Sequence, residues 1–96
     1  MATIELTDEN FAETVEKNDI VVIDFWADWC GPCKTFAPIF EKVSQNHADI
    51  VFAKCDTEKQ PMLASQFGIK SIPTLTILRE KLVLLSQAGV LPESTF

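Results

Sequence analysis

Two kinds of hydrophobic spacing alternate along the chain, and each predicts one kind of element. Residues 20–25 (IVVIDF) and 50–55 (IVFAKC) are largely apolar on both alternating faces, a pattern typical of buried, parallel strands. Apolar residues at helical spacing predict three helices around these strands. They are Phe11 and Val15 in the first helix, Phe36, Ile39, Phe40 and Val43 in the second, and Leu63 and Phe67 in the third.

Capping residues and prolines set the expected ends of these helices. Thr7 is the expected N-cap of the first helix, and residues 18–19 (ND) end it. Pro32 opens the second helix, because proline is tolerated in a first turn. Pro61 lies near the start of the third helix and Gly68 stops it.

Three shorter segments, residues 3–6, 74–78 and 82–85, complete the expected strands. Only Arg79-Glu80-Lys81 joins the last two, so these two must form an antiparallel pair. Because this link contains no glycine, a type I′ turn is not expected there. The order β-α-β-α-β-α-β-β predicts an α/β fold of three layers: helices on both faces of a mixed sheet, with parallel strands and a C-terminal antiparallel hairpin.

Length and composition indicate one small domain, residues 1–96. Fourteen Asp and Glu against eight Lys and Arg give a formal net charge of −6, which argues against a nucleic-acid partner because a phosphate backbone requires a basic face. No run of about 18 apolar residues predicts a membrane span. The first ten residues lack the apolar segment of a secretory signal, so the expected location is cytoplasmic.

Two of the three cysteines form a C-x-x-C pair in the link between a buried strand and the second helix. Reactive groups in α/β sheets lie beyond the carboxyl ends of strands, where this link falls. Cys30 is expected at the first helical turn, where the helix dipole and the Cys33 N–H stabilise a thiolate. Because Cys33 lies one turn further on the same face, the pair can form and break a disulfide with little backbone motion.

Two other interpretations of the cysteine pair are possible. A zinc site would need His47 and Cys55 as further ligands, but the residues between Cys33 and His47 span about 20 Å as a helix, so no metal site is expected. An inert structural disulfide is disfavoured by the position of the pair at a helix N-terminus. Cys55 itself is expected to be a small buried hydrophobe.

Asp24 is the one acidic residue of an otherwise apolar strand. Burial disfavours the charged carboxylate and raises its pKa, which makes Asp24 a candidate proton acceptor for Cys33. Lys54 has the corresponding late position in residues 50–55, so it pairs with Asp24 and lowers that pKa if the two strands are adjacent. A purely structural pairing at a solvated strand end is the alternative. Trp26 is expected in the core and Trp29 at an exposed rim.

Taken together, these motifs resemble the thioredoxin family over residues 3–96. The matching segments are D-F-W-A (24–27), W-C-G-P-C-K (29–34), Pro38, K-C-D (54–56), F-G-I (67–69), S-I-P-T (71–74) and Gly89. A lone C-x-x-C is a weak signal. In contrast, W-C-G-P-C-K directly after D-F-W-A and followed by I-P-T is highly specific.

The resemblance implies a protein-disulfide reductase, that is, a thiol–disulfide oxidoreductase that takes part in electron transport and cell redox homeostasis. It implies that Cys30 is the attacking nucleophile and Cys33 the resolving thiol. Asp24 is then the buried proton-transfer group, with Lys54 beside it and a cis Pro73 against the cysteines. The implied substrate-docking surface consists of Trp29, Gly31, Pro32, Ile72, Pro73 and Gly89.

The resemblance also implies partners, namely disulfide-containing substrate proteins and an NADPH-dependent flavoprotein, thioredoxin reductase. It implies no cofactor besides the Cys30–Cys33 disulfide. A non-catalytic binding module that holds a partner protein on its Trp29–Pro73 surface is the alternative function. The family closes with a helix over one sheet face, and residues 91–94 (LPES) resemble its start. An uncovered apolar face predicts a monomer of low stability or weak self-association.

Overall fold

The computed structural model of the chain describes residues 3–92 and has the predicted order of elements. The strands are β1 (Thr3–Glu5), β2 (Ile20–Trp26), β3 (Val51–Asp56), β4 (Thr74–Arg79) and β5 (Leu82–Ala88). The helices are α1 (Phe11–Lys17), α2 (Gly31–Gln45) and α3 (Pro61–Gln66). Gly68, with a φ of 64°, follows the end of α3 as predicted.

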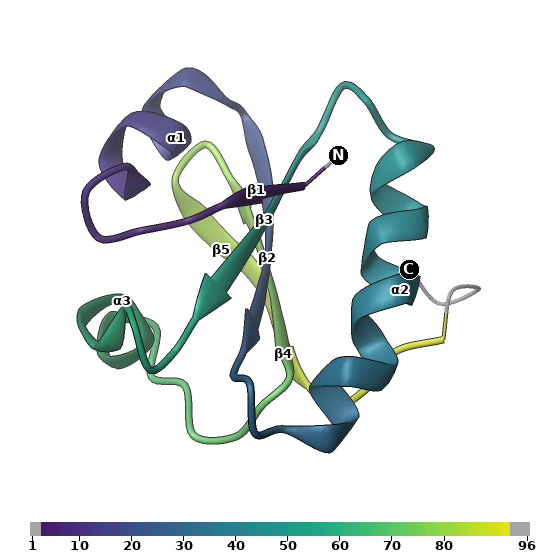
Figure 1. Cartoon of the computed structure of the whole chain (residues 1–96). Helices are drawn as coiled ribbons and strands as arrows, with labels where there is room; N and C mark the ends of the chain where they lie inside the picture. The colour runs from purple at the N-terminus through teal and green to yellow at the C-terminus, as the bar shows by residue number, and fades with distance from the viewer. Residues whose placement is uncertain (1–2, 93–96) are drawn as a thin grey trace.

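The five strands form one mixed sheet in the order β1-β3-β2-β4-β5. β3 pairs in parallel with both β1 and β2, whereas β4 is antiparallel to β2 and to β5. Helices α1 and α3 cover one face of the sheet and α2 covers the other (Figure 1). The predicted three-layer α/β architecture with a C-terminal antiparallel hairpin is therefore confirmed.

Side-chain alternation along β2 divides the core in two. Val21, Ile23 and Phe25 point into the cluster under α1 and α3. Val22 points into the other cluster, which contains three residues of α2: Phe36, Phe40 and Val43. Asp24 alternates with Val22 on the same face, so the strand directs this acid beneath the helix that starts at the cysteines.

The start of α1 differs from the prediction. The N-cap is Asn10 and not Thr7, because residues 8–10 form a turn before the helix. Thr7 Oγ1 still accepts the Asn10 N–H at 3.1 Å, and Asn10 Oδ1 accepts the Thr7 N–H at 2.8 Å, the reciprocal pattern of a capping box. Asp8 Oδ1 accepts the Leu63 N–H in α3 at 3.2 Å. This tertiary contact draws the segment away from the helix.

The turn between β4 and β5 also contradicts the prediction. The link is only Glu80-Lys81, with φ values of 51° and 72°, so both residues adopt the left-handed conformation of a type I′ turn without any glycine. The right-handed twist of the strands favours this turn. The Glu80 N–H donates to the Asp19 carbonyl at 2.8 Å, and Lys81 forms an ion pair with Glu16. These contacts hold the turn to α1 and the residues after it.

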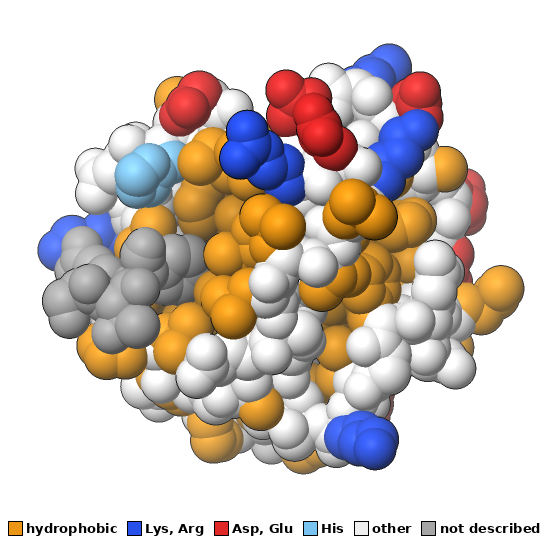
Figure 2. All heavy atoms as spheres, turned by 180° about the vertical axis from the view of Figure 1, so that it is seen from behind, with side chains coloured by type: hydrophobic (Ala, Val, Ile, Leu, Met, Phe, Trp, Pro, Cys, Tyr) orange, Lys and Arg blue, Asp and Glu red, His pale blue; other side chains and the backbone are white. Residues whose placement is uncertain are grey.

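β5 forms one edge of the sheet, and all seven of its residues are exposed. Apolar side chains gather on the side of the molecule seen in Figure 2, next to a groove of about 550 Å³ between α1, α3 and the β4–β5 hairpin. Leu91 and Pro92 are irregular, and the rest of the expected helix start, residues 93 and 94, lies outside the described residues. Among residues 3–92 no helix has the length and apolar composition needed to cross a membrane.

Candidate active site

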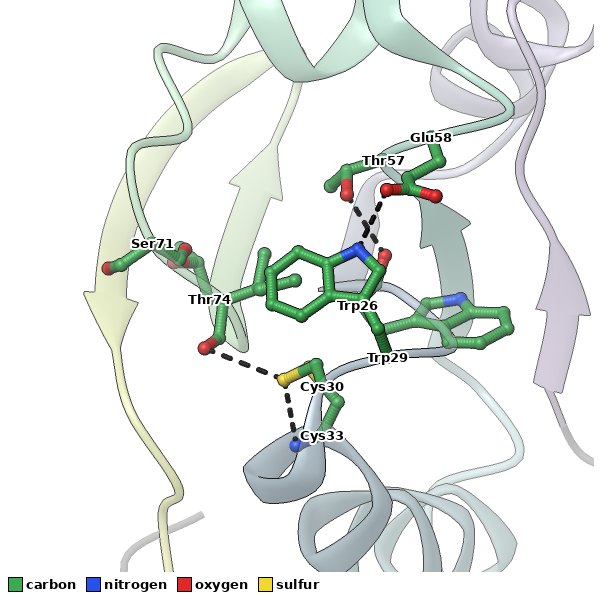
Figure 3. Close-up of a disulfide and its surroundings, with 9 residues drawn as sticks. Trp26, Trp29, Cys30, Cys33, Thr57, Glu58, Ser71 and Thr74 are labelled. Carbon is green, nitrogen blue, oxygen red and sulfur yellow. Dashed lines mark hydrogen bonds between the residues drawn. A yellow bond between two sulfur atoms is a disulfide. The ribbon is translucent and has the colours of Figure 1, made fainter.

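The cysteine pair lies at the N-terminus of α2, just beyond the carboxyl end of the central strand β2 (Figure 3). Cys30 is the N-cap, with extended backbone angles, and its Sγ accepts the Cys33 N–H at 3.1 Å. The two residues form a disulfide across a Cα–Cα distance of 5.2 Å. The predicted position of Cys30 at the start of the helix and the predicted Cys33 N–H donor are both confirmed. Each cysteine is only 3% exposed, so a reacting partner must reach the pair across its rim.

That rim consists of the residues predicted as a docking surface. Trp29 is 68% exposed, and Gly31, Pro32 and Gly89 are exposed as well, whereas Ile72 is half-buried. The Ile72–Pro73 bond is cis, as the resemblance implied, and the Ile72 carbonyl oxygen lies 3.7 Å from Cys30 Sγ. The Gly89 N–H donates to the Pro73 carbonyl at 2.8 Å. The fold thus brings the six residues of the candidate surface around one disulfide.

A groove of about 400 Å³ lies between Trp29 and Ile72, beside the disulfide. Ala64 and Ile69 contribute apolar walls, and Lys70 contributes a positive charge. The groove is large enough for a side chain of a docked polypeptide. Such a segment would approach Cys30 along the exposed face of Trp29.

Glu58 is a residue of the rim that the sequence pattern did not reveal. Its Oε2 accepts the Trp29 indole N–H at 2.7 Å, from a position just after β3 (Figure 3). Thr57 next to it donates its N–H to the Trp26 carbonyl at 2.9 Å, which ties the end of β3 to the end of β2. Its position in the sequence could have indicated Glu58, because residues that follow two adjacent parallel strands lie close together at the carboxyl end of the sheet.

Asp24 lies on β2 and is fully buried, with no hydrogen-bond partner for either carboxylate oxygen among the described residues. Burial raises the pKa of this carboxyl to about 7, although the positive charge of Lys54 acts to lower it. The two residues are register partners on the parallel strands β2 and β3. The predicted desolvation of Asp24 and the predicted adjacency of Lys54 are therefore confirmed.

Trp26 is not a plain core residue, as the sequence had suggested. It is half-buried, and its ring has the Lys54 Nζ 5.0 Å from its centroid. A cavity of about 170 Å³ touches Trp26, Lys54 and Cys33, among others. It is large enough for water next to the second cysteine.

The remaining candidate metal ligands lie apart from the pair. His47 follows the far end of α2 and stacks on the Phe52 ring with centroids 6.3 Å apart. Cys55 is fully buried in the cluster under α1 and α3, on the opposite face of the sheet from Asp24, and burial raises the pKa of its thiol to about 12. Within residues 3–92 no three His, Cys, Asp or Glu side chains are gathered as metal ligands would be.

This geometry allows one kind of chemistry in particular. A cystine that can open at a helix N-terminus places a thiolate where backbone N–H groups and the helix dipole favour negative charge. The buried acid Asp24, with a pKa of about 7, lies on the face of the sheet that α2 covers. An exposed indole and a cis-proline segment border the first. The arrangement suits exchange of the disulfide with a sulfur of another polypeptide.

Comparison with known proteins agrees with this interpretation. The Thioredoxin family model matches residues 2–95. "Putative thioredoxin 2" of Streptomyces coelicolor is 57% identical over 93 residues, which cover 97% of this chain and 69% of the relative. "Thioredoxin C-3" of Corynebacterium nephridii is 43% identical over 89 residues, covering 92% of this chain and 61% of that protein.

Solved structures show the same likeness. A structure of Plasmodium falciparum thioredoxin superposes with a TM-score of 0.89 at 29% identity, covering 97% of this chain and 90% of the other. A mutant thioredoxin from Halobacterium salinarum superposes with a TM-score of 0.87 at 29% identity, covering 98% of this chain and 84% of the other. Both the sequence and the fold therefore indicate one family.

Proposed function

The chain belongs to the thioredoxin family, and from that premise we propose that it reduces disulfide bonds of other proteins, with Cys30 as the attacking and Cys33 as the resolving cysteine. A thiol–disulfide oxidoreductase needs two thiols that close and reopen as a disulfide. The observation that carries the proposal is the Cys30–Cys33 disulfide at the N-terminus of α2. A docking surface and a buried proton acceptor on either side of it complete the requirements.

The first step is attack by the Cys30 thiolate on one sulfur of a substrate disulfide. A bond forms between Cys30 Sγ and that sulfur, the substrate S–S bond breaks, and the other substrate sulfur leaves as a thiolate that takes up a proton. The N-terminus of α2 and the Cys33 N–H favour the thiolate before attack. Substrate is held along Trp29 and the Ile72–Pro73 segment, where an extended chain has access to the backbone.

The second step is attack by Cys33 on Cys30 Sγ. Asp24 accepts the Cys33 proton through water, a role that suits a carboxyl titrating near pH 7. The mixed disulfide breaks, the second substrate sulfur leaves as a thiolate that takes up a proton from water, and the Cys30–Cys33 disulfide forms. Two electrons have passed from the protein to the substrate.

Return of the protein to its dithiol form requires a reductant. We assign this role to thioredoxin reductase, with the Cys30–Cys33 disulfide as the redox group and no bound cofactor. In this scheme the protein takes part in electron transport and redox homeostasis in the cytoplasm, where thiols are kept reduced. Weak self-association through the uncovered sheet face beside β5 is part of the same proposal.

The test is reduction of insulin disulfides by the chain in the presence of dithiothreitol. Wild-type protein should turn over and Cys30→Ser should be inactive. Cys33→Ser, reduced and then freed of dithiothreitol before it meets the substrate, should react once and accumulate a mixed disulfide. Cys55→Ser is the matched control, because Cys55 lies on the other face of the sheet and should leave turnover unchanged.

A binding module predicts a different result. Such a protein would hold a partner on the Trp29–Pro73 surface equally well in the Cys30→Ser and Cys33→Ser variants, and would show no turnover in any form. Absence of a trapped mixed disulfide in Cys33→Ser, with wild-type turnover near background, would therefore reject the reductase function.

A further inference from the structure

We propose that Trp26 is a positioning residue for Lys54: its indole face fixes the ammonium group beside Asp24, on the side of the sheet that serves Cys33. The inference rests on the proposed function only in taking Asp24 as the acceptor of the Cys33 proton. The geometry itself concerns three residues near the ends of two adjacent strands.

The contact between Trp26 and Lys54 is of the cation–π type. The Lys54 Nζ lies 5.0 Å from the ring centroid, within the range of about 6 Å over which an ammonium is attracted by an indole face. A lysine has a flexible four-carbon stem and samples many positions unless a partner holds its head group. Within residues 3–92 no carboxylate makes an ion pair with Lys54. Its contact with the ring is therefore the interaction that selects a position.

Two cavities meet at this pair of side chains. The inner cavity, about 170 Å³, also touches Cys33, Asp28 and Lys34. The outer cavity, about 300 Å³, lies toward β1 and is lined by Thr3, Ile4, Glu5, Trp26, Lys54, Asp56 and Lys59. Trp26 and Lys54 are the residues common to both. The ammonium therefore has open space on two sides, and the indole at the boundary limits its movement.

Charged groups lie near Lys54 on the neighbouring elements, and the carboxylates among them attract its ammonium group. Glu5 is its register partner on β1, and Asp24 is its partner on β2. The other charged residues that line the two cavities are Asp56 at the end of β3, Lys59 after it, Asp28 in the β2–α2 link and Lys34 in α2.

Glu5 and Asp56 attract the ammonium toward the outer cavity, and Asp24 attracts it inward. If the ammonium moved outward, Asp24 would lose the nearby positive charge that opposes the effect of burial on its pKa. Trp26 prevents this displacement by holding the Lys54 side chain against its ring.

The experiment measures the pKa of Asp24 by NMR, from its carboxyl carbon, in the oxidised full chain. Trp26→Leu and Lys54→Met should each raise that pKa by about one unit, because each removes the charge from beside the acid. The double variant should raise it no further than Lys54→Met does, since both changes act through one interaction. Trp26→Phe should restore most of the wild-type value, because phenylalanine keeps an aromatic face.

Trp29→Leu is the matched control, because this second tryptophan of the site contacts Glu58 instead of Lys54 and should leave the pKa of Asp24 unchanged. A Trp26→Leu shift that is equally large with Met at position 54 would show a packing or hydration effect and overturn the proposal. So would an unchanged pKa in Trp26→Leu.

A wild-type measurement covers the case in which Trp26→Leu does not fold. The Lys54 ε-methylene protons should resonate upfield of exposed lysines and show contacts to indole protons. Their absence would also reject the proposal. Because these readouts do not depend on turnover, a failure of the insulin assay would leave them interpretable.

Discussion

At the scale of single residues, Asp24 combines the two properties that matter most for the site. It lies in the central strand β2 with both carboxylate oxygens unpaired among the described residues, and burial raises its pKa to about 7 while Lys54 acts in the opposite direction. The folded chain therefore keeps a proton on Asp24 at pH values at which the unfolded chain has released it. The group that we propose for proton transfer thus reduces stability at neutral pH and above.

This linkage predicts how stability depends on pH. The contribution of Asp24 is most favourable below pH 4 and is lost as the pH rises toward 7, because the folded form binds the proton more tightly than the unfolded form. The loss amounts to about 4 kcal/mol if the unfolded carboxyl has an ordinary pKa. Asp24→Asn should remove this slope from the free energy of unfolding, measured by urea denaturation between pH 4 and 8.

Asp28→Asn is the control for this experiment, because Asp28 is an exposed acid near the same end of β2. It should retain the wild-type slope. Equal slopes in wild type and Asp24→Asn would contradict the assigned pKa.

The residue properties predictable from sequence were those with local causes. The Cys33 N–H donor to Cys30 follows from an N-cap position and a proline that supplies no donor, and the desolvation of Asp24 follows from its apolar neighbours in the strand. In contrast, the contact of Glu58 with Trp29 and that of Trp26 with Lys54 join side chains from different strands or loops. Hydrophobic periodicity contains no information on where a long polar side chain ends.

At the scale of elements, the interiors of helices and strands followed the hydrophobic pattern, whereas the ends did not always do so. α1 starts after the expected cap because Asp8 binds at α3. The β4–β5 link is shorter than expected because β4 continues to Arg79. In both cases a contact with a distant segment outweighed the local preference of a few residues, and a single sequence does not display such contacts.

The type I′ turn leads to a prediction about stability. Lys81 has a φ of 72°, a conformation that costs a non-glycine residue about 1–2 kcal/mol. Lys81→Gly should therefore increase the free energy of unfolding by less than about 1 kcal/mol, because the loss of the exposed ion pair with Glu16 and the greater freedom of glycine in the unfolded chain offset most of the relieved strain. The midpoint of urea denaturation measures the effect.

Glu16→Gln separates the two contributions. It removes the ion pair and keeps the turn, so it should change stability by less than about 1 kcal/mol. In the Glu16→Gln background, Lys81→Gly should stabilise at least as much as in the wild type. A lower urea midpoint for Lys81→Gly in both backgrounds would show that the turn is not strained.

At the scale of the whole molecule, the centre of the sheet is covered and its β5 edge is not. β2, at the centre, is packed from both faces, whereas β5 at the edge exposes a run of apolar residues in which Leu82 is 70% and Leu84 63% exposed. An edge strand with apolar side chains and no charge is a surface on which another strand can pair. The net charge of −6 opposes the approach of a second copy but is spread over the molecule.

This imbalance predicts weak, concentration-dependent self-association through β5. Leu84→Lys should weaken it about tenfold or more, because the substitution removes apolar area and adds a like charge to each copy. Sedimentation velocity over a range of protein concentrations measures the change. Met62→Lys is the matched control, since Met62 is 73% exposed on α3 and away from the strand. The same weakening in both variants would show that the effect is not specific to β5.

Because Cys55 is buried, the reactivity of its thiol reports local unfolding of the core around it. In the oxidised protein the other two cysteines are joined, so Cys55 carries the one free thiol. Cys55 is packed under α1 and α3, and burial raises the pKa of its thiol to about 12. It therefore reacts with an alkylating reagent only while these helices have separated from the sheet. The rate at which unmodified wild-type protein gains the label, followed by mass spectrometry, therefore reports how readily this face of the sheet opens. It does so in native buffer, without denaturant or an introduced probe.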